Sequence, residues 1–188
     1  MHNILIAITA ATAMAAAMPG YAASMTKESY KSTTKQIDAT FKADKDQCKS
    51  LKGNAEDVCM AEAKAKQKIA KADAEADYKN TDQARADARK TRADAEYSVA
   101  KEKCDDRAGN AKDVCIKEAK AAHVSGLADA KVAKTAGAAR SDVNAARRDA
   151  QEDKRDAQYK VAVEKCDSFS GDAKDRCVKD AKARFGKS

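Results

Sequence analysis

The sequence contains no tryptophan, a single proline (Pro19), and aromatic residues that make up 4% of the chain. From Ser24 onward, Leu, Ile, Val and Phe together number 17. A catalytic α/β domain or a β-sandwich needs many more β-branched and aromatic side chains, because these fill strands and build a thick core. The composition therefore argues against both classes and predicts a protein with a thin core.

Residue patterns that carry catalysis are also scarce. From Ser24 onward the only histidine is His123, which lies in an Ala-rich stretch and is expected to be solvent-exposed. We find no Gly-rich phosphate loop and no Ser-centred nucleophile motif. Acidic residues alternate with Lys and Arg, a pattern typical of a solvated helix surface. We therefore expect no enzyme activity, no catalytic or cofactor-binding residues and no cofactor.

The chain carries no dense block of one charge, although Lys and Arg (37) outnumber Asp and Glu (30) and leave a formal charge of +7. Because acidic residues are interspersed everywhere, no continuous basic surface is available to follow a nucleic-acid backbone. Aromatic residues for base stacking are few. We expect no nucleic-acid binding, and a weak attraction to anionic polymers of the cell envelope stays open.

The first 22 residues have the pattern of a secretory signal peptide. Residues 4–18 are uncharged and mostly apolar, Pro19-Gly20 ends the run, and Gly20 and Ala22 are small residues at the −3 and −1 positions of a cleavage site. The alternative is a retained N-terminal anchor, but the run is short for a membrane span. We expect cleavage after Ala22, export to the periplasm and no stable membrane insertion afterwards.

The remainder of the chain is three copies of one unit, which we place at residues 25–80, 81–137 and 138–188. Each copy has two cysteines 11 residues apart, and they are Cys48 and Cys59, Cys104 and Cys115, and Cys166 and Cys177. After the second cysteine of each copy comes an acid-Ala-Lys-Ala motif: Glu62–Ala65, Glu118–Ala121 and Asp180–Ala183. An aromatic residue precedes each first cysteine by seven positions: Phe41, Tyr97 and Tyr159.

The copies are rich in strong helix formers, and each cysteine loop carries signals that end one helix and begin another. The glycines suit a turn or helix end with positive φ, and the next residue is a candidate N-cap. These pairs are Gly53 and Asn54, Gly109 and Asn110, and Gly171 and Asp172. Acid–lysine pairs four residues apart, such as Glu62–Lys66 and Asp156–Lys160, are expected to support the helices.

The cysteines are expected to pair within each copy as disulfides 48–59, 104–115 and 166–177. On one continuous helix, cysteines 11 residues apart would be about 16 Å apart, too far for a disulfide, so the chain must reverse between them. A zinc site usually has cysteines two to four residues apart, often with His. A redox site would favour a Cys-x-x-Cys motif. We therefore expect no metal site and rank thiol chemistry below structural bridges.

The resulting fold prediction is all-α, an elongated set of antiparallel helical hairpins or a thin bundle, with each turn closed by a disulfide. Residues 55–103 and 111–165 are expected to form two long helices, flanked by shorter ones at about 26–48 and 173–185. Asn80 and Gly126 or Gly137 are candidate breaks in the long helices, and whether the helices are continuous there stays open.

The repeated Cys-x4-Gly-Asn-Ala-x-Asp-Val-Cys unit, complete at Cys48–Cys59 and Cys104–Cys115 and relaxed at Cys166–Cys177, resembles a group of small exported proteins of Gram-negative bacteria. Members are often labelled cell envelope biogenesis protein TolA, or TolA-like, and are mostly uncharacterised. The likeness to TolA itself is compositional, so its energy-coupling role is not carried over. The resemblance implies a periplasmic, non-enzymatic protein and supplies no site residues.

Two functional hypotheses follow. The first is a structural, spacer or stress-protective protein of the cell envelope. The second is an adaptor that presents a helical face to an envelope protein or an anionic polymer. Redox or metal-binding function of the cysteines ranks third. The partner is not identified by the sequence, and a homodimer stays open because amphipathic helices often self-associate.

Overall fold

The computed structural model describes residues 25–188, so the predicted signal peptide lies outside the described residues. The described part is all-α, as predicted, with no strand. Its helices are α1 (Lys27–Cys48), α2 (Asn54–Lys79), α3 (Asp82–Cys104), α4 (Gly109–Lys134), α5 (Arg140–Cys166) and α6 (Gly171–Phe185). Each of the three predicted repeats contains one pair of consecutive helices.

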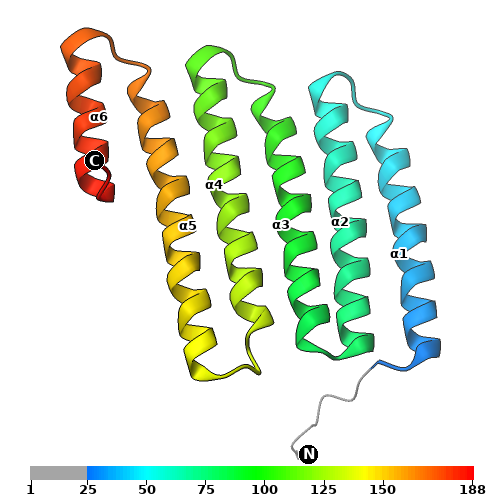
Figure 1. Cartoon of the computed structure of the whole chain (residues 1–188). Helices are drawn as coiled ribbons and strands as arrows, with labels where there is room; N and C mark the ends of the chain where they lie inside the picture. The colour runs from blue at the N-terminus through cyan, green and yellow to red at the C-terminus, as the bar shows by residue number, and fades with distance from the viewer. Residues whose placement is uncertain (1–24) are drawn as a thin grey trace, which may run out of the picture.

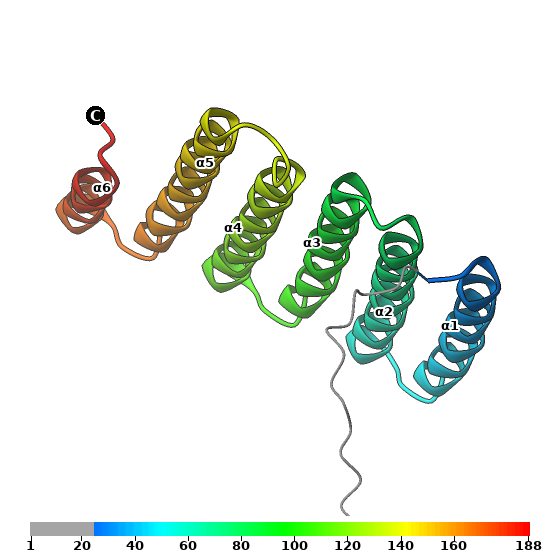
Figure 2. The ribbon, with the colours of Figure 1, turned by 90° about the horizontal axis from the view of Figure 1, so that it is seen from below.

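The six helices lie side by side in a single antiparallel layer (Figure 1). Each helix contacts only the helices that precede and follow it in the chain. Figure 2 shows the helices nearly end-on, in one row with no described helix over either face. The three cysteine loops lie at one end of the layer, and the α2–α3 and α4–α5 connections lie at the other (Figure 1). Both faces of the layer are therefore open along the described chain.

The prediction of two long helices, at residues 55–103 and 111–165, is wrong, because the chain reverses its direction within each of these ranges. The first reversal is at Asn80, which adopts a left-handed conformation with φ 48° and ends α2. Thr81 then caps α3 by accepting a hydrogen bond from the Ala84 amide at 3.1 Å. The second reversal lies in residues 135–139, around Gly137, whereas α4 runs without interruption through Gly126.

The core contains only alanine and cysteine. Every described residue classed as buried is one of these two types, and Cys48, Cys104 and Cys166 are at most 1% exposed. One apolar cluster joins Ala76 of α2 to Ala84 and Ala88 of α3 at the first reversal. Such small side chains let helix axes approach closely, but each removes little apolar area from water. The layer therefore has close contacts and modest hydrophobic stabilisation per contact.

Ion pairs join neighbouring helices more often than they follow one helix. Glu62 pairs with Lys103 of α3 at 2.7 Å rather than with Lys66, and Asp156 pairs with Lys187 at 2.6 Å rather than with Lys160. Within α2, Glu75 and Lys79, which are also four residues apart, do pair, at 2.5 Å. Packing brings charges of adjacent helices together, and these contacts compete with the i,i+4 partners that sequence spacing suggests.

Candidate functional site

The three disulfides close the cysteine loops in the pairs that the spacing predicts. The Cα atoms are 5.5 Å apart in Cys48–Cys59, 5.7 Å in Cys104–Cys115 and 5.6 Å in Cys166–Cys177, normal distances for a disulfide. The described chain has no free cysteine. Each bridge joins the last residue of one helix to the second turn of the next, and so fixes one hairpin.

The predicted N-caps at the start of α2, α4 and α6 are wrong. Asn54, Asn110 and Asp172 each lie inside the first turn, and no side chain caps these three helices. The preceding glycines have positive φ, +59° at Gly53, +55° at Gly109 and +53° at Gly171, as the turn prediction requires. Asn110 instead donates from Nδ2 to the Glu164 carbonyl at the end of α5, at 3.2 Å. This hydrogen bond links the second hairpin to the third.

His123 is half-buried between the helices of the middle hairpin, so the prediction that it is solvent-exposed is wrong. Its side chain is 20% exposed. The ring stacks on Tyr97 of α3 with centroids 4.7 Å apart, and Nε2 lies 2.6 Å from Asp94 Oδ1. Asp94 and Tyr97 lie one turn apart on α3, so both contact the same ring of α4. We call Asp94, Tyr97 and His123 the hairpin lock.

The outer hairpins have locks at the corresponding positions. In the first, Gln67 Nε2 donates to Asp38 Oδ1 at 2.6 Å. In the third, Tyr159 meets Phe185 edge to face with centroids 6.1 Å apart, and Asp156 pairs with Lys187. The signal for these contacts is a repeated Asp-Ala-x-aromatic motif, of which only the aromatic residue was predicted to recur. It occurs at Asp38–Phe41, Asp94–Tyr97 and Asp156–Tyr159.

The aspartates at the corresponding positions of the outer hairpins, Asp38 and Asp156, have a lowered pKa. The hydrogen bond from Lys71, followed by that from Gln67, lowers the pKa of Asp38. The hydrogen bond from Lys187 lowers the pKa of Asp156. Both shifts favour the ionised carboxylate that the contact needs, and both groups are exposed enough that solvent screens the interaction.

Asp94 and His123 of the hairpin lock resemble the Asp–His pair of a hydrolase, but the residues around His123 differ from those of a hydrolase site. Tyr97 stacks on the imidazole ring, and no hydroxyl or thiol of the described chain forms a hydrogen bond with His123. An Asp–His pair activates a nucleophile only when one is within hydrogen-bond reach of the histidine. The geometry therefore supports a cross-link between α3 and α4.

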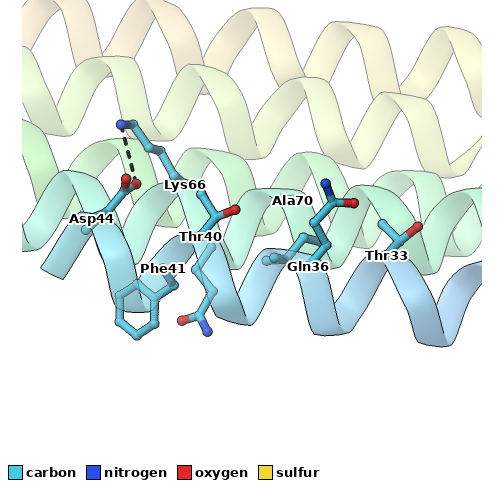
Figure 3. Close-up of a pocket in the computed structure, with 10 residues that line it drawn as sticks. Thr33, Gln36, Thr40, Phe41, Asp44, Lys66 and Ala70 are labelled. Carbon is cyan, nitrogen blue, oxygen red and sulfur yellow. Dashed lines mark ion pairs between the residues drawn. The ribbon is translucent and has the colours of Figure 1, made fainter. Parts of the chain in front are cut away.

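A groove of about 290 Å³ lies between α1 and α2 (Figure 3). Ile37, Phe41 and Ala70 supply its apolar surface. Figure 3 shows the Asp44–Lys66 ion pair, 3.6 Å long, joining the two helices across it. Its volume is at the lower limit of typical ligand sites, about 300–1,000 Å³. The groove can accept a small apolar group, and its only charged lining residues, Asp44 and Lys66, already pair with each other.

Two further grooves lie between hairpins, at corresponding positions of the repeat. The α2–α3 groove, about 250 Å³, is lined by Met60, Lys64 and Lys68. The α4–α5 groove, about 430 Å³, is lined by the corresponding Ile116, Lys120 and Val124. Acidic residues line both as well, including Asp57 and Asp153. These grooves mix apolar and charged groups and belong to the same face of the layer.

Along residues 25–188, no group of three or more His, Cys, Asp or Glu side chains is arranged to hold a metal ion. None of the described helices is long and apolar enough to cross a membrane. Three disulfides are compatible with an exported protein, because such bonds persist in oxidising compartments. Comparison with protein-family models, with curated proteins and with solved structures finds no match to this chain.

Proposed function

We propose that the protein is a non-enzymatic structural component of the bacterial periplasm, a spacer or stress-protective element of the cell envelope. The observation that carries this proposal is the core: the described buried residues are alanines and disulfide-bonded cysteines only. Such a core stiffens a flat layer of helices without enclosing a cavity. The disulfides would form in the oxidising periplasm, and the first 22 residues supply an export signal.

The dimensions suit a spacer. A helix of 26 residues, the length of α2 and α4, is about 39 Å long. Six helices packed at axis separations of about 8–10 Å span about 45 Å across the layer. Covalent bridges at one end of each hairpin keep this shape even if individual helix contacts open transiently.

A deletion strain tests this proposal. Cells that lack the protein should be more sensitive to detergent and to osmotic shock, and the wild-type gene should restore resistance. A gene encoding serine at all six cysteine positions should not restore it, because the layer loses its bridges. Wild-type growth of the deletion strain under every such stress would contradict the proposal, as would recovery of the protein from the cytoplasmic fraction.

A further inference from the structure

The acid-Ala-Lys-Ala motif is present in all three repeats. The structure accounts for its acid in the first two repeats and for its first alanine in all three. Glu62 and Glu118 pair with Lys103 and Lys165 of the following helix, both at 2.7 Å. The first alanine of the motif packs against the partner helix of the hairpin. These alanines, Ala63, Ala119 and Ala181, are 2%, 8% and 7% exposed.

The lysine of the motif has no such role. Lys64 and Lys120 are exposed and Lys182 is partly exposed. Within residues 25–188, none of the three forms an ion pair, whereas Lys66, Lys71, Lys117 and Lys154 each pair with a carboxylate of a neighbouring helix. A residue that is identical in three copies, solvated and unpaired is not explained by stability of the fold, since an exposed helix position accepts many residues at similar free energy.

The three lysines lie on the same face of the layer. Lys64 lines the groove between α2 and α3, and Lys120 lines the corresponding groove between α4 and α5. Lys182 holds the same repeat position on α6. Because every second helix carries one, the lysines form a row that crosses the helices, with about 16–20 Å between neighbours. We call Lys64, Lys120 and Lys182 the lysine row.

Aspartates border the row on both sides. Asp57, Asp113 and Asp175 precede the lysines by seven residues, which is two turns toward the disulfide end on the same helix face. Asp38, Asp94 and Asp156 bond to residues that follow the lysines, toward the other end of the hairpin. A broad anionic surface would meet all of these carboxylates. A chain one polymer wide would pass between these aspartates and meet the lysines, together with Glu102 of α3, which lines the same groove as Lys64.

From this placement, we propose that the lysine row binds a linear anionic polymer that lies across the helices, perpendicular to their axes. Attraction to each lysine releases counterions from the polymer, so binding weakens as salt rises. Met60 and Ile116 provide apolar surface in the grooves beside Lys64 and Lys120. This surface goes beyond the structural role proposed above and does not depend on it.

Long-chain inorganic polyphosphate is a suitable probe, with the oxidised full mature chain titrated at several salt concentrations. Relative to the unchanged chain, a triple variant K64Q/K120Q/K182Q should bind about tenfold more weakly or worse. Its slope of log affinity against log salt should be shallower by about two, the value for three lost contacts with a single-stranded polyanion. The triple variant K64R/K120R/K182R should retain binding, because it keeps the charges in place.

The matched control removes three other unpaired lysines, K27Q/K52Q/K134Q, which gives the same net charge. It should change affinity less than twofold. Equal losses in the two glutamine variants would overturn the proposal in favour of net charge alone, and so would retained binding in K64Q/K120Q/K182Q. Vesicles of phosphatidylglycerol that bind as tightly as polyphosphate, through the same lysines, would overturn it in favour of a membrane surface. Circular dichroism verifies that each variant keeps its helices.

Discussion

Gly126 of α4 lies directly against Ala93 of α3: a Cβ atom added at position 126 would be 2.7 Å from the Ala93 Cβ. The corresponding positions of the first hairpin hold Ile37 and Ala70, which both line the groove between α1 and α2. The small Ala–Gly pair lets the backbones of α3 and α4 approach closely at this contact.

Gly126→Ala should destabilise the protein by about 1 kcal/mol. Alanine is better than glycine in a helix by about 1 kcal/mol, but overpacking costs about 1–3 kcal/mol, and the nearest atoms are the Cβ and Cα of Ala93, which no side-chain rotation can move. Urea unfolding followed by circular dichroism measures the change. The double variant Ala93→Gly/Gly126→Ala should recover most of the loss, and a double variant no more stable than Gly126→Ala would contradict the close-contact explanation.

Removing one disulfide should cost about 3 kcal/mol, the chain-entropy value for a loop of this length. Cys104→Ser/Cys115→Ser tests the middle hairpin, and Cys48→Ser/Cys59→Ser is the matched change at the edge. Reductant should lower the unfolding midpoint of the unchanged protein and leave a variant without cysteines unaffected. A peptide map without reduction should recover the three local pairs, whereas bridges between hairpins would contradict the layer.

The two contacts of His123 in the hairpin lock can be tested separately by introducing the residues that the other repeats have at the corresponding position. His123→Phe, which introduces the residue found at Phe185, keeps a ring on Tyr97 and loses the hydrogen bond to Asp94. His123→Gln, which introduces the residue found at Gln67, keeps the hydrogen bond and loses the stack. Each should cost about 1 kcal/mol, and His123→Ala about 2. An alanine variant as stable as the unchanged protein would show that the lock contributes nothing.

Stability should fall in acid as Asp38 and Asp156 are protonated. The pKa of each carboxyl is lower in the folded protein than its ordinary value of 3.8. Their contribution is therefore present above about pH 4 and is lost as the pH falls through the lowered values. Urea midpoints between pH 2.5 and 7 should decline less steeply below pH 4 in Asp156→Asn than in the unchanged protein. Asp153→Asn, at a carboxylate without an ion pair in the structure, is the control and should leave that decline unchanged.

Much of the fold could be predicted because it depends on local features. The cysteine spacing and the positive-φ glycines define the three loops, and Asn80-Thr81-Asp82 is a recognisable stop and start signal. Whether such a signal kinks a helix or reverses the chain depends on tertiary packing. Here Ala84 and Ala88 of α3 bury themselves against Ala76 of α2. Alanine patterns are too uniform to specify that contact from the sequence.

The lock at His123 could not be predicted from the residue alone, since its partners Asp94 and Tyr97 lie on another helix. Comparing the three repeats would have indicated Asp94, because Asp-Ala-x-aromatic recurs. The N-cap predictions failed for a similar reason. Asn110 has a cap-like sequence position, but the neighbouring hairpin offers it the Glu164 carbonyl.

The relaxed third copy of the cysteine motif has a structural explanation, because α6 has no described helix on its outer side. Val58 and Val114 are half-buried, and Val58 lies on the same helix face as Ala61 and Ala65, which line the groove toward the next hairpin. The corresponding Arg176 is exposed. A charged residue on an uncovered helix edge helps to keep the molecules of a repeat protein dispersed.

Arg176→Val together with Asp172→Asn should therefore promote self-association. The double variant gives α6 the residues that α2 and α4 have at the corresponding positions, Asn54 and Val58 in the first repeat and Asn110 and Val114 in the second. Of these, Asn110 bonds to the following hairpin. Sedimentation velocity should show oligomers that increase with protein concentration, whereas the unchanged protein should show less association at equal concentration. Arg184→Val, which adds the same hydrophobic residue to α6 at a position away from this edge, is the control. If both variants associate equally, added hydrophobicity rather than the repeat interface is responsible.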